Sequence, residues 1–447
     1  MRHLTGAVIR DITGGETRGE LLREEITDIT TDSRTVTPGC LFAAIPGARV
    51  DGHDFIATAA EKGASCVLCS RFVDCDIPQI KVEDTRAALG SVAAFYRSQF
   101  ELPVFGVTGS VGKTTAKEMI GAVLSQGLNT LKTKGNFNND LGVPLTLFRL
   151  REEHEAAVIE MGISGFGEMT YLADMVRPQI AVFTLIGDAH LEFLGDRAGV
   201  LRAKSEIIGS MPEDGLVIAN GDDPLLKAHD FGRETWLVGL GEDCALRATE
   251  IENDGLGGVR CVIEGMGRRI PAEIPALGEH MVYAALLGAA AGIAMHLDDE
   301  QIRRGIGGYA PVGGRGRVVQ TDRITILDDS YNANPTSMKN ALDNLKTLPG
   351  RHVAILGDMR ELGEDAPAMH RELGRYAAET GAVVIACGEL SKETAAGAGE
   401  GTRWFESTPA LIEALPALIR PEDAVLVKAS LAMDFKSVVA ALEEMKF

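Results

Sequence analysis

Residues 106–119 read GVTGSVGKTTAKEM, a glycine-rich stretch that ends in Gly-Lys-Thr-Thr. Gly109 and Gly112 allow backbone amides to point at phosphate oxygens, and a helix that begins beside Lys113 adds its positive dipole end. Lys113 can reach the terminal phosphates of a nucleotide, and the hydroxyl of Thr114 can bind Mg²⁺. We therefore predict a phosphate-binding loop rather than a plain Gly-rich turn. The predicted ATP contacts are Thr108, Gly109, Ser110, Val111, Gly112, Lys113, Thr114 and Thr115.

The loop departs from the common spacing of Gly, four residues and Gly-Lys-Ser/Thr, because position 107 is valine. Three polar residues farther along the chain are further candidates for chemistry. Glu160 ends the apolar stretch VIEMG, where an acid is costly unless it is paired or binds a metal. His190 follows the apolar FTLI, and Lys204 precedes Glu206 by two positions. A structural histidine and a surface lysine paired with Glu206 remain open alternatives.

Asn136, Asn138 and Asn139 lie in KGNFNNDLGVP (residues 134–144), between two glycines and before a proline. Asparagine is common in turns, so these residues alone do not separate a turn from a ligand site.

The elements that must position these residues alternate between strand and helix. Apolar strands are expected in LPVFGVTG, AAVIEMG, IAVFTLI and GLVIANGDD, and again in ITILDDS, HVAILGD, AVVIACG and DAVLVKAS. This alternation predicts doubly wound, mainly parallel α/β sheets, which place ligands at the carboxyl ends of their strands. The glycines of APVGGRGRVV mark a hinge. We predict three α/β domains over 1–100, 101–310 and 311–447, with clefts between them.

Composition narrows the class of protein. The chain has 447 residues and a formal net charge of −20, which argues against nucleic acid as the main partner but not against anionic substrates. Residues 1–16 have no apolar core followed by a small-residue cleavage site, so we expect no signal peptide. The apolar run 281–295 is shorter than a membrane span, so we expect a buried helix there. The isolated Cys66-x-x-Cys69 lacks a second pair at zinc spacing. We expect reduced, buried thiols and a cytoplasmic enzyme.

These motifs together resemble one family. The phosphate loop, the asparagine cluster before Gly-x-Pro, Glu160-Met-Gly, the His190 segment and Lys204-x-Glu206 occur in this order in the Mur ligases, the ATP-dependent amide ligases of peptidoglycan synthesis. The shortened phosphate loop is that family's form. The resemblance extends from about residue 30 to residue 440 and implies a three-domain architecture with a central phosphate-loop domain and a Rossmann-like C-terminal domain.

The resemblance also implies roles for individual residues. It places Thr114 and Glu160 on one Mg²⁺, and His190 and a carbamylated Lys204 around a second. It implies ATP contacts by His280, Arg315, Asp329, Tyr331 and Asn332. It implies contacts with the UDP-linked substrate by Ser33, Arg34, Asn136, Asn138 and Asn139. From the residues alone, Arg34 is either a uracil or diphosphate contact or one half of a surface ion pair.

Within the family, GKTTAKEMI, DDSYNANPTSMKNAL and LGDMRELGED are similar to the branch that joins D-alanyl-D-alanine to UDP-N-acetylmuramoyl-tripeptide. That branch implies ATP and Mg²⁺, small-molecule substrates and a monomer. A sibling that adds the third amino acid, a folylpolyglutamate synthase and a nucleotide-switch ATPase are the alternatives. Two positions depart from the family pattern: Ala284 replaces an asparagine, and Leu431 replaces the arginine of Lys-Gly-Ser-Arg.

Overall fold

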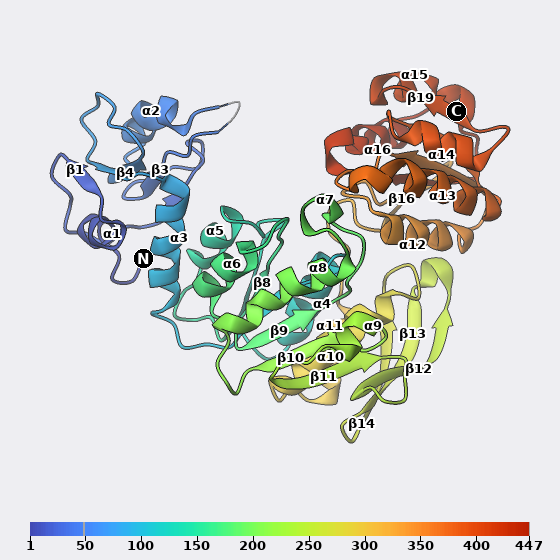
Figure 1. Cartoon of the computed structure of the whole chain (residues 1–447), viewed down its shortest axis with the longest axis horizontal. Helices are drawn as coiled ribbons and strands as arrows, with labels where there is room; N and C mark the ends of the chain where they lie inside the picture. The colour runs from blue at the N-terminus through green and yellow to red at the C-terminus, as the bar shows by residue number, and fades with distance from the viewer. Residues whose placement is uncertain (48–49, 447) are drawn as a thin grey trace.

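Three lobes, each built on its own sheet, make up the structure, a computed structural model that describes residues 1–47 and 50–446. Figure 1 shows the central lobe between the N-terminal lobe (blue) and the C-terminal lobe (orange to red). Within the described residues the sheets have five, nine and six strands, in that order along the chain. The predicted α/β fold class is confirmed.

The N-terminal lobe has the strand order β1-β5-β4-β3-β2, with β1 antiparallel to β5 and the other pairs parallel. Its strands are β1 (Glu16–Arg18), β2 (Ile29–Thr30), β3 (Leu41–Ala43), β4 (Cys66–Cys69) and β5 (Gln79–Lys81). Its helices are α1 (Gly6–Thr13), α2 (Ile56–Glu61) and α3 (Thr85–Arg97). Cys66 and Cys69 are buried free thiols, and burial raises their pKa values to about 12 and about 11. The expected burial of these two thiols is confirmed.

The central sheet runs in the order β14-β13-β12-β11-β10-β9-β6-β8-β7. All neighbouring strands in the part of the sheet between β12 and β7 are parallel, as predicted. Its parallel strands are β6 (Val104–Thr108), β7 (Thr130–Lys132), β8 (Ala156–Glu160), β9 (Ile180–Phe183), β10 (Leu216–Asn220), β11 (Glu234–Gly239) and β12 (Leu246–Asn253). The sequence did not predict the antiparallel extension of β12 by β13 (Val259–Gly265) and β14 (Arg268–Ile274).

The helices of the central lobe cover both faces of this sheet. They are α4 (Lys113–Leu124), α5 (Gly142–Leu147), α6 (Glu168–Val176), α7 (Leu191–Leu194), α8 (Arg197–Ser205), α9 (Pro224–Ala228), α10 (Met281–Ala294) and α11 (Asp299–Gly307). Helix α10 is the apolar run expected to be buried. Gly288 and Gly292 let it approach α4, because an added Cβ there would lie 2.9 Å from Met119 Cγ and from Val123 Cγ1, respectively. No helix among the described residues combines the length and apolar character that crossing a membrane requires.

The C-terminal sheet has the order β15-β16-β20-β17-β18-β19, with β15 antiparallel to β16 and the other pairs parallel. Its strands are β15 (Arg317–Gln320), β16 (Thr325–Asp328), β17 (Arg351–Gly357), β18 (Val383–Cys387), β19 (Arg403–Phe405) and β20 (Asp423–Lys428). Its helices are α12 (Pro335–Lys346), α13 (Ala366–Glu379), α14 (Ser391–Ala398), α15 (Thr408–Leu418) and α16 (Phe435–Glu443). Strand β20 is buried along its whole length, which explains its nearly continuous apolar sequence.

Candidate active site

The glycine-rich loop joins the end of β6 to the start of α4, the context that a phosphate loop requires. Gly109 has φ +144°, and a Cβ added there would lie 2.0 Å from Thr184 Oγ1. Thr184, next to the end of β9, donates a 2.6 Å hydrogen bond to the carbonyl of Val111, while the amide of Ser110 donates to the carbonyl of Leu185 at 2.7 Å. The neighbouring strand therefore fixes the loop, and only glycine fits position 109.

We expect Gly109→Ala to weaken nucleotide binding strongly and to lower the free energy of unfolding by roughly 1–3 kcal/mol, because the new methyl group collides with Thr184 at a strained φ. A nucleotide titration and thermal melts measure the two effects. Gly399→Ala is the matched control, since Gly399 also has positive φ but has no atom within 4 Å of an added Cβ. A Gly109→Ala protein that binds ATP as tightly as the parent would contradict this view of the loop.

Lys113, the first residue of α4, folds back over the loop. Its Nζ donates to the carbonyls of Gly109 at 2.7 Å and Ser110 at 3.4 Å. Burial lowers the pKa of Lys113, an effect that Glu160 opposes and the charge of Arg315 reinforces. The ammonium group thus lies where the terminal phosphates of a nucleotide would meet the loop.

Glu160, at the end of β8, is a buried carboxylate with donors on both oxygens. Thr114 Oγ1 donates to Oε2 and Asn138 Nδ2 donates to Oε1, each at 2.8 Å. The ammonium group of Lys117, fully buried, lies 3.7 Å from Oε2. Hydroxyl and carboxylate oxygens are the ligands that Mg²⁺ prefers, so Thr114 and Glu160 fit one such ion. Among residues 1–47 and 50–446, no group of three or more His, Cys, Asp or Glu side chains is placed to hold a metal ion, so an ion held by Thr114 and Glu160 would need further oxygen ligands from outside the protein.

His190 meets the C-terminal lobe. Its Nδ1 lies 2.6 Å from Glu361 Oε2, on the loop that follows β17. Burial lowers the pKa of His190, while Glu361 opposes the shift and the charges of Lys113 and Lys204 reinforce it. These three basic groups are therefore within electrostatic reach of one another.

Lys204 is buried in α8 and, within the described chain, no carboxylate lies within 4 Å of its amine. The expected alternative partner, Glu206, instead accepts hydrogen bonds from the amides of Gly167 and Thr170 at 2.9–3.2 Å. Burial, reinforced by the charge of Lys113, lowers the pKa of Lys204 far below that of a free lysine. A buried, neutral amine is the form that reacts with CO₂, and the resulting carbamate would give His190 an anionic neighbour suited to a second Mg²⁺.

Residues of the C-terminal lobe face the phosphate loop across a cleft. The guanidinium carbon of Arg315 lies 3.7 Å from the ring centre of Tyr331, which is a close stacking contact. Asp329 Oδ2 accepts a 2.5 Å hydrogen bond from Lys428 Nζ, which also donates to the carbonyl of Asn332 at 2.9 Å. Between the two lobes lies a cleft of about 650 Å³, a volume typical of small-molecule sites.

Most of the predicted site residues line this cleft. They are Ser110, Val111, Gly112, Lys113, Thr115, Asn138, Asn139, Glu160, His190, His280, Arg315, Asp329, Tyr331 and Asn332. Thr108, Gly109 and Thr114 belong to the loop itself, and Lys204 is buried. Asn136 is exposed, and Ser33 and Arg34 lie in the N-terminal lobe.

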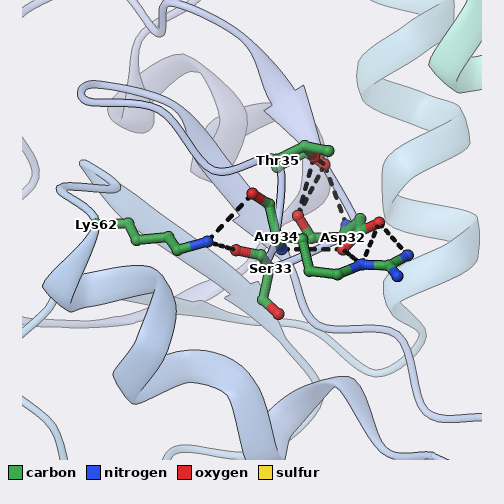
Figure 2. Close-up of polar contacts among 6 residues, drawn as sticks. Asp32, Ser33, Arg34, Thr35 and Lys62 are labelled. Atoms are coloured by element: carbon green, nitrogen blue, oxygen red, sulfur yellow. Dashed lines mark hydrogen bonds and ion pairs between the residues drawn. The ribbon is translucent and has the colours of Figure 1, made fainter.

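The Asp32–Arg34 segment forms a compact, solvent-facing structure (Figure 2). The guanidinium group of Arg34 donates three hydrogen bonds of 2.7–3.1 Å to Asp32, which lowers the pKa of Asp32 to about 2. Lys62 Nζ donates to the carbonyls of Ser33 at 2.9 Å and Arg34 at 3.1 Å. The side chain of Arg34 is 88% exposed, so an ion pair and an accessible guanidinium coexist.

Sequence reasoning did not identify Lys117 or Glu361. Lys117 lies one helical turn after Lys113, but nothing local signals that its amine is buried against Glu118 and Glu160. Glu361 contacts His190 across the lobes, a pairing between residues far apart in sequence that periodicity cannot show.

Comparison with known proteins places this geometry in a family. Three domain models match: "Mur ligase family, catalytic domain" over residues 25–97, "Mur ligase middle domain" over 107–292, and "Mur ligase, glutamate ligase domain" over 314–431. The UDP-N-acetylmuramoyl-tripeptide–D-alanyl-D-alanine ligase of Escherichia coli (strain K12) is 38% identical, over 99% of each chain. The chain belongs to the Mur ligase family. The same-named protein of Bacillus subtilis (strain 168) is 36% identical over 93% of each chain.

Solved structures agree with this family assignment. A crystal structure of MurF from Acinetobacter baumannii superposes with a TM-score of 0.91 at 34% identity and covers 99% of both chains. The MurF ligase of Thermotoga maritima in complex with ADP gives a TM-score of 0.82 at 28% identity, covering 94% of this chain and 97% of that one. The three-domain Mur ligase architecture expected from the sequence is confirmed.

The two departures from the Mur ligase pattern lie at different places. Ala284 lines the cleft on α10, so this chain has a methyl group where the pattern has an amide. Leu431 follows β20 and is 49% exposed, so no arginine extends from that position.

Proposed function

We propose that this Mur ligase joins D-alanyl-D-alanine to UDP-N-acetylmuramoyl-tripeptide with the conversion of ATP to ADP and phosphate. The observation that carries the proposal is the cleft itself, where the phosphate loop, the buried Glu160 and His190 face the C-terminal lobe. The name shared by relatives that match nearly the full chain supports the choice of substrates.

The tripeptide's terminal carboxylate attacks the γ-phosphorus, ADP leaves, and an acyl phosphate forms. The amine of the dipeptide then attacks the acyl carbon, phosphate leaves, and the amine loses a proton. Lys113 and the loop amides hold the transferring phosphoryl group and stabilise its charge. Thr114 and Glu160 would hold one Mg²⁺, and His190 and a carbamylated Lys204 would hold a second, and these ions would neutralise the charge crowded between carboxylate and phosphate.

Each domain brings one reactant in this proposal. Domain 1–100 receives the uridine nucleotide near Ser33 and Arg34, while domain 101–310 binds ATP and its asparagine loop (Asn136, Asn138 and Asn139) meets the UDP-linked substrate. Domain 311–447 binds the dipeptide and contributes four residues to the ATP cleft: Arg315, Asp329, Tyr331 and Asn332. His280 of the central domain contacts the adenine. Closure of the lobes would exclude water from the acyl phosphate. We propose a cytoplasmic enzyme that acts as a monomer, with both walls of the cleft supplied by one chain.

Phosphate release tests the reaction class. The proposal expects release only when ATP, Mg²⁺, the UDP-tripeptide and the dipeptide are all present, with little release when either acceptor or amine is omitted. Steady release from ATP alone would instead identify a nucleotide-switch ATPase.

A further inference from the structure

The amine substrate proposed above carries a carboxylate, and the C-terminal lobe must hold it. Two polar residues at and just after the end of β20, Lys428 and Ser430, are candidates for this role, but both are buried and hydrogen-bonded. Lys428 is 2% exposed and donates to Asp329 and to the carbonyl of Asn332. Ser430 is 4% exposed, and its Oγ accepts a 2.9 Å hydrogen bond from the amide of Arg360. The charge of Lys428 is therefore already paired with Asp329, and Ser430, whose hydroxyl can still donate one hydrogen bond, carries no charge.

Arg360, on the loop after β17, has an exposed guanidinium group beside these residues. Its Nη2 lies 3.9 Å from Asp358 Oδ2 and 3.9 Å from Met433 Sδ, both at the limit of contact. Asp358 is itself buried and accepts hydrogen bonds from the amide and hydroxyl of Ser391 at 2.8 and 2.7 Å. The guanidinium group therefore keeps most of its donors available.

The position of Arg360 relative to the reacting groups is also suitable. The next residue, Glu361, contacts His190 in the cleft at 2.6 Å and so turns away from Arg360 toward the central lobe. The hydrogen bond to Ser430 fixes the Arg360 loop against the residues that follow β20. An extended dipeptide spans about 7 Å, and neighbouring Cα atoms are about 3.8 Å apart. An extended dipeptide with its amine near His190 would be long enough to approach the loop that carries Arg360, because Glu361 of the same loop contacts His190.

We propose that Arg360 is the residue that binds the carboxylate of the dipeptide substrate. The proposal rests on the function proposed above. A guanidinium fork binds a carboxylate through two parallel hydrogen bonds, which gives both affinity and orientation. In this chain Leu431 leaves the turn after β20 without a cation, and the side chain of Arg360 extends over that turn to Met433. Arg360 thus supplies a positive charge from the loop after β17, the strand next to β20 in the sheet.

The test compares D-alanyl-D-alanine with its C-terminal amide in the full-length enzyme. The parent should prefer the free acid strongly. Arg360→Ala should raise the KM for the free acid roughly 10- to 100-fold and abolish the preference over the amide, because the lost partner is a charge-paired donor. The KM values for ATP and the UDP-tripeptide should stay unchanged. Arg360→Lys, which keeps the charge but not the fork, should fall between the two.

Arg371→Ala is the matched control, since Arg371 is an exposed arginine of the same lobe, paired with Glu393 on the neighbouring helix. It should leave the acid-to-amide preference intact. An Arg360→Ala enzyme that still prefers the free acid as strongly as the parent would overturn this inference while leaving the proposed reaction in place. A parent that forms no product from the dipeptide would instead overturn the proposed function.

Discussion

Lys113→Ala is expected to lower the rate of ligation by at least about a hundred- to a thousand-fold while the fold stays intact. The ammonium group of Lys113 lies over the glycine-rich loop and donates to the carbonyls of Gly109 and Ser110, where the terminal phosphates of a bound nucleotide would lie. Its charge stabilises the phosphoryl group most as negative charge accumulates in transfer. Product formation under saturating substrates measures the loss, and circular dichroism with a thermal melt checks the fold.

Lys227→Ala serves as the control for Lys113→Ala, because Lys227 is a partly exposed lysine of the same lobe that pairs with Asp243. It should retain nearly full activity. Near-normal turnover by a folded Lys113→Ala protein would show that the loop does not act on phosphate.

Lys204→Ala is expected to be nearly inactive and to regain part of its activity with a short carboxylic acid. A free lysine has a pKa of about 10.4, so its amine reacts with CO₂ only where that value is lowered. Burial and the charge of Lys113 lower the pKa of Lys204 in this structure. The carbamate would be an anion that can face Mg²⁺, and a small carboxylate can occupy the space left by the truncated side chain. Turnover measured with and without the added acid gives the result.

Arg202→Ala is the control for Lys204→Ala, because Arg202 lies two residues earlier on α8 but is exposed. It should neither lose most activity nor respond to the added acid. Electron density that ends at a bare Lys204 amine, in crystals grown with Mg²⁺, an ATP analogue and bicarbonate, would contradict the carbamate. Such a result would not bear on the roles proposed for Glu160 and the phosphate loop.

The parallel strands, the buried helix α10 and the glycine-rich loop could be predicted from the sequence, because short stretches of the chain determine each of them. The apolar segments of the parallel strands and the helix at 281–294 follow from burial on all sides, and Gly109 and Gly112 follow from the shape of the loop. The antiparallel strands β13 and β14 were missed. Their alternating pattern, with exposed residues between buried ones, is weaker than the continuous apolar run of a parallel strand.

The side-chain partners at the site could not be predicted in the same way. Lys428 donates a hydrogen bond to Asp329, which is 99 residues away in sequence. Lys204 is buried in α8, whereas the carboxylate of Glu206 accepts a hydrogen bond from the amide of Gly167, so the alternative of an ion pair between these two residues does not form. These outcomes depend on how β16 and β20, or α6 and α8, pack together, and no local pattern records that packing.

The central claim is that this Mur ligase adds a dipeptide to a UDP-linked tripeptide, and one competition measures it directly. The enzyme is given ATP, Mg²⁺, the UDP-tripeptide and the UDP-dipeptide, with D-alanyl-D-alanine and isotope-labelled diaminopimelate at equal concentration, so that newly made UDP-tripeptide differs in mass from the UDP-tripeptide supplied. Mass spectrometry then identifies the products. The account predicts UDP-N-acetylmuramoyl-pentapeptide, formed together with equal amounts of ADP and phosphate. A UDP-tripeptide made from diaminopimelate and the UDP-dipeptide as the main product would contradict it.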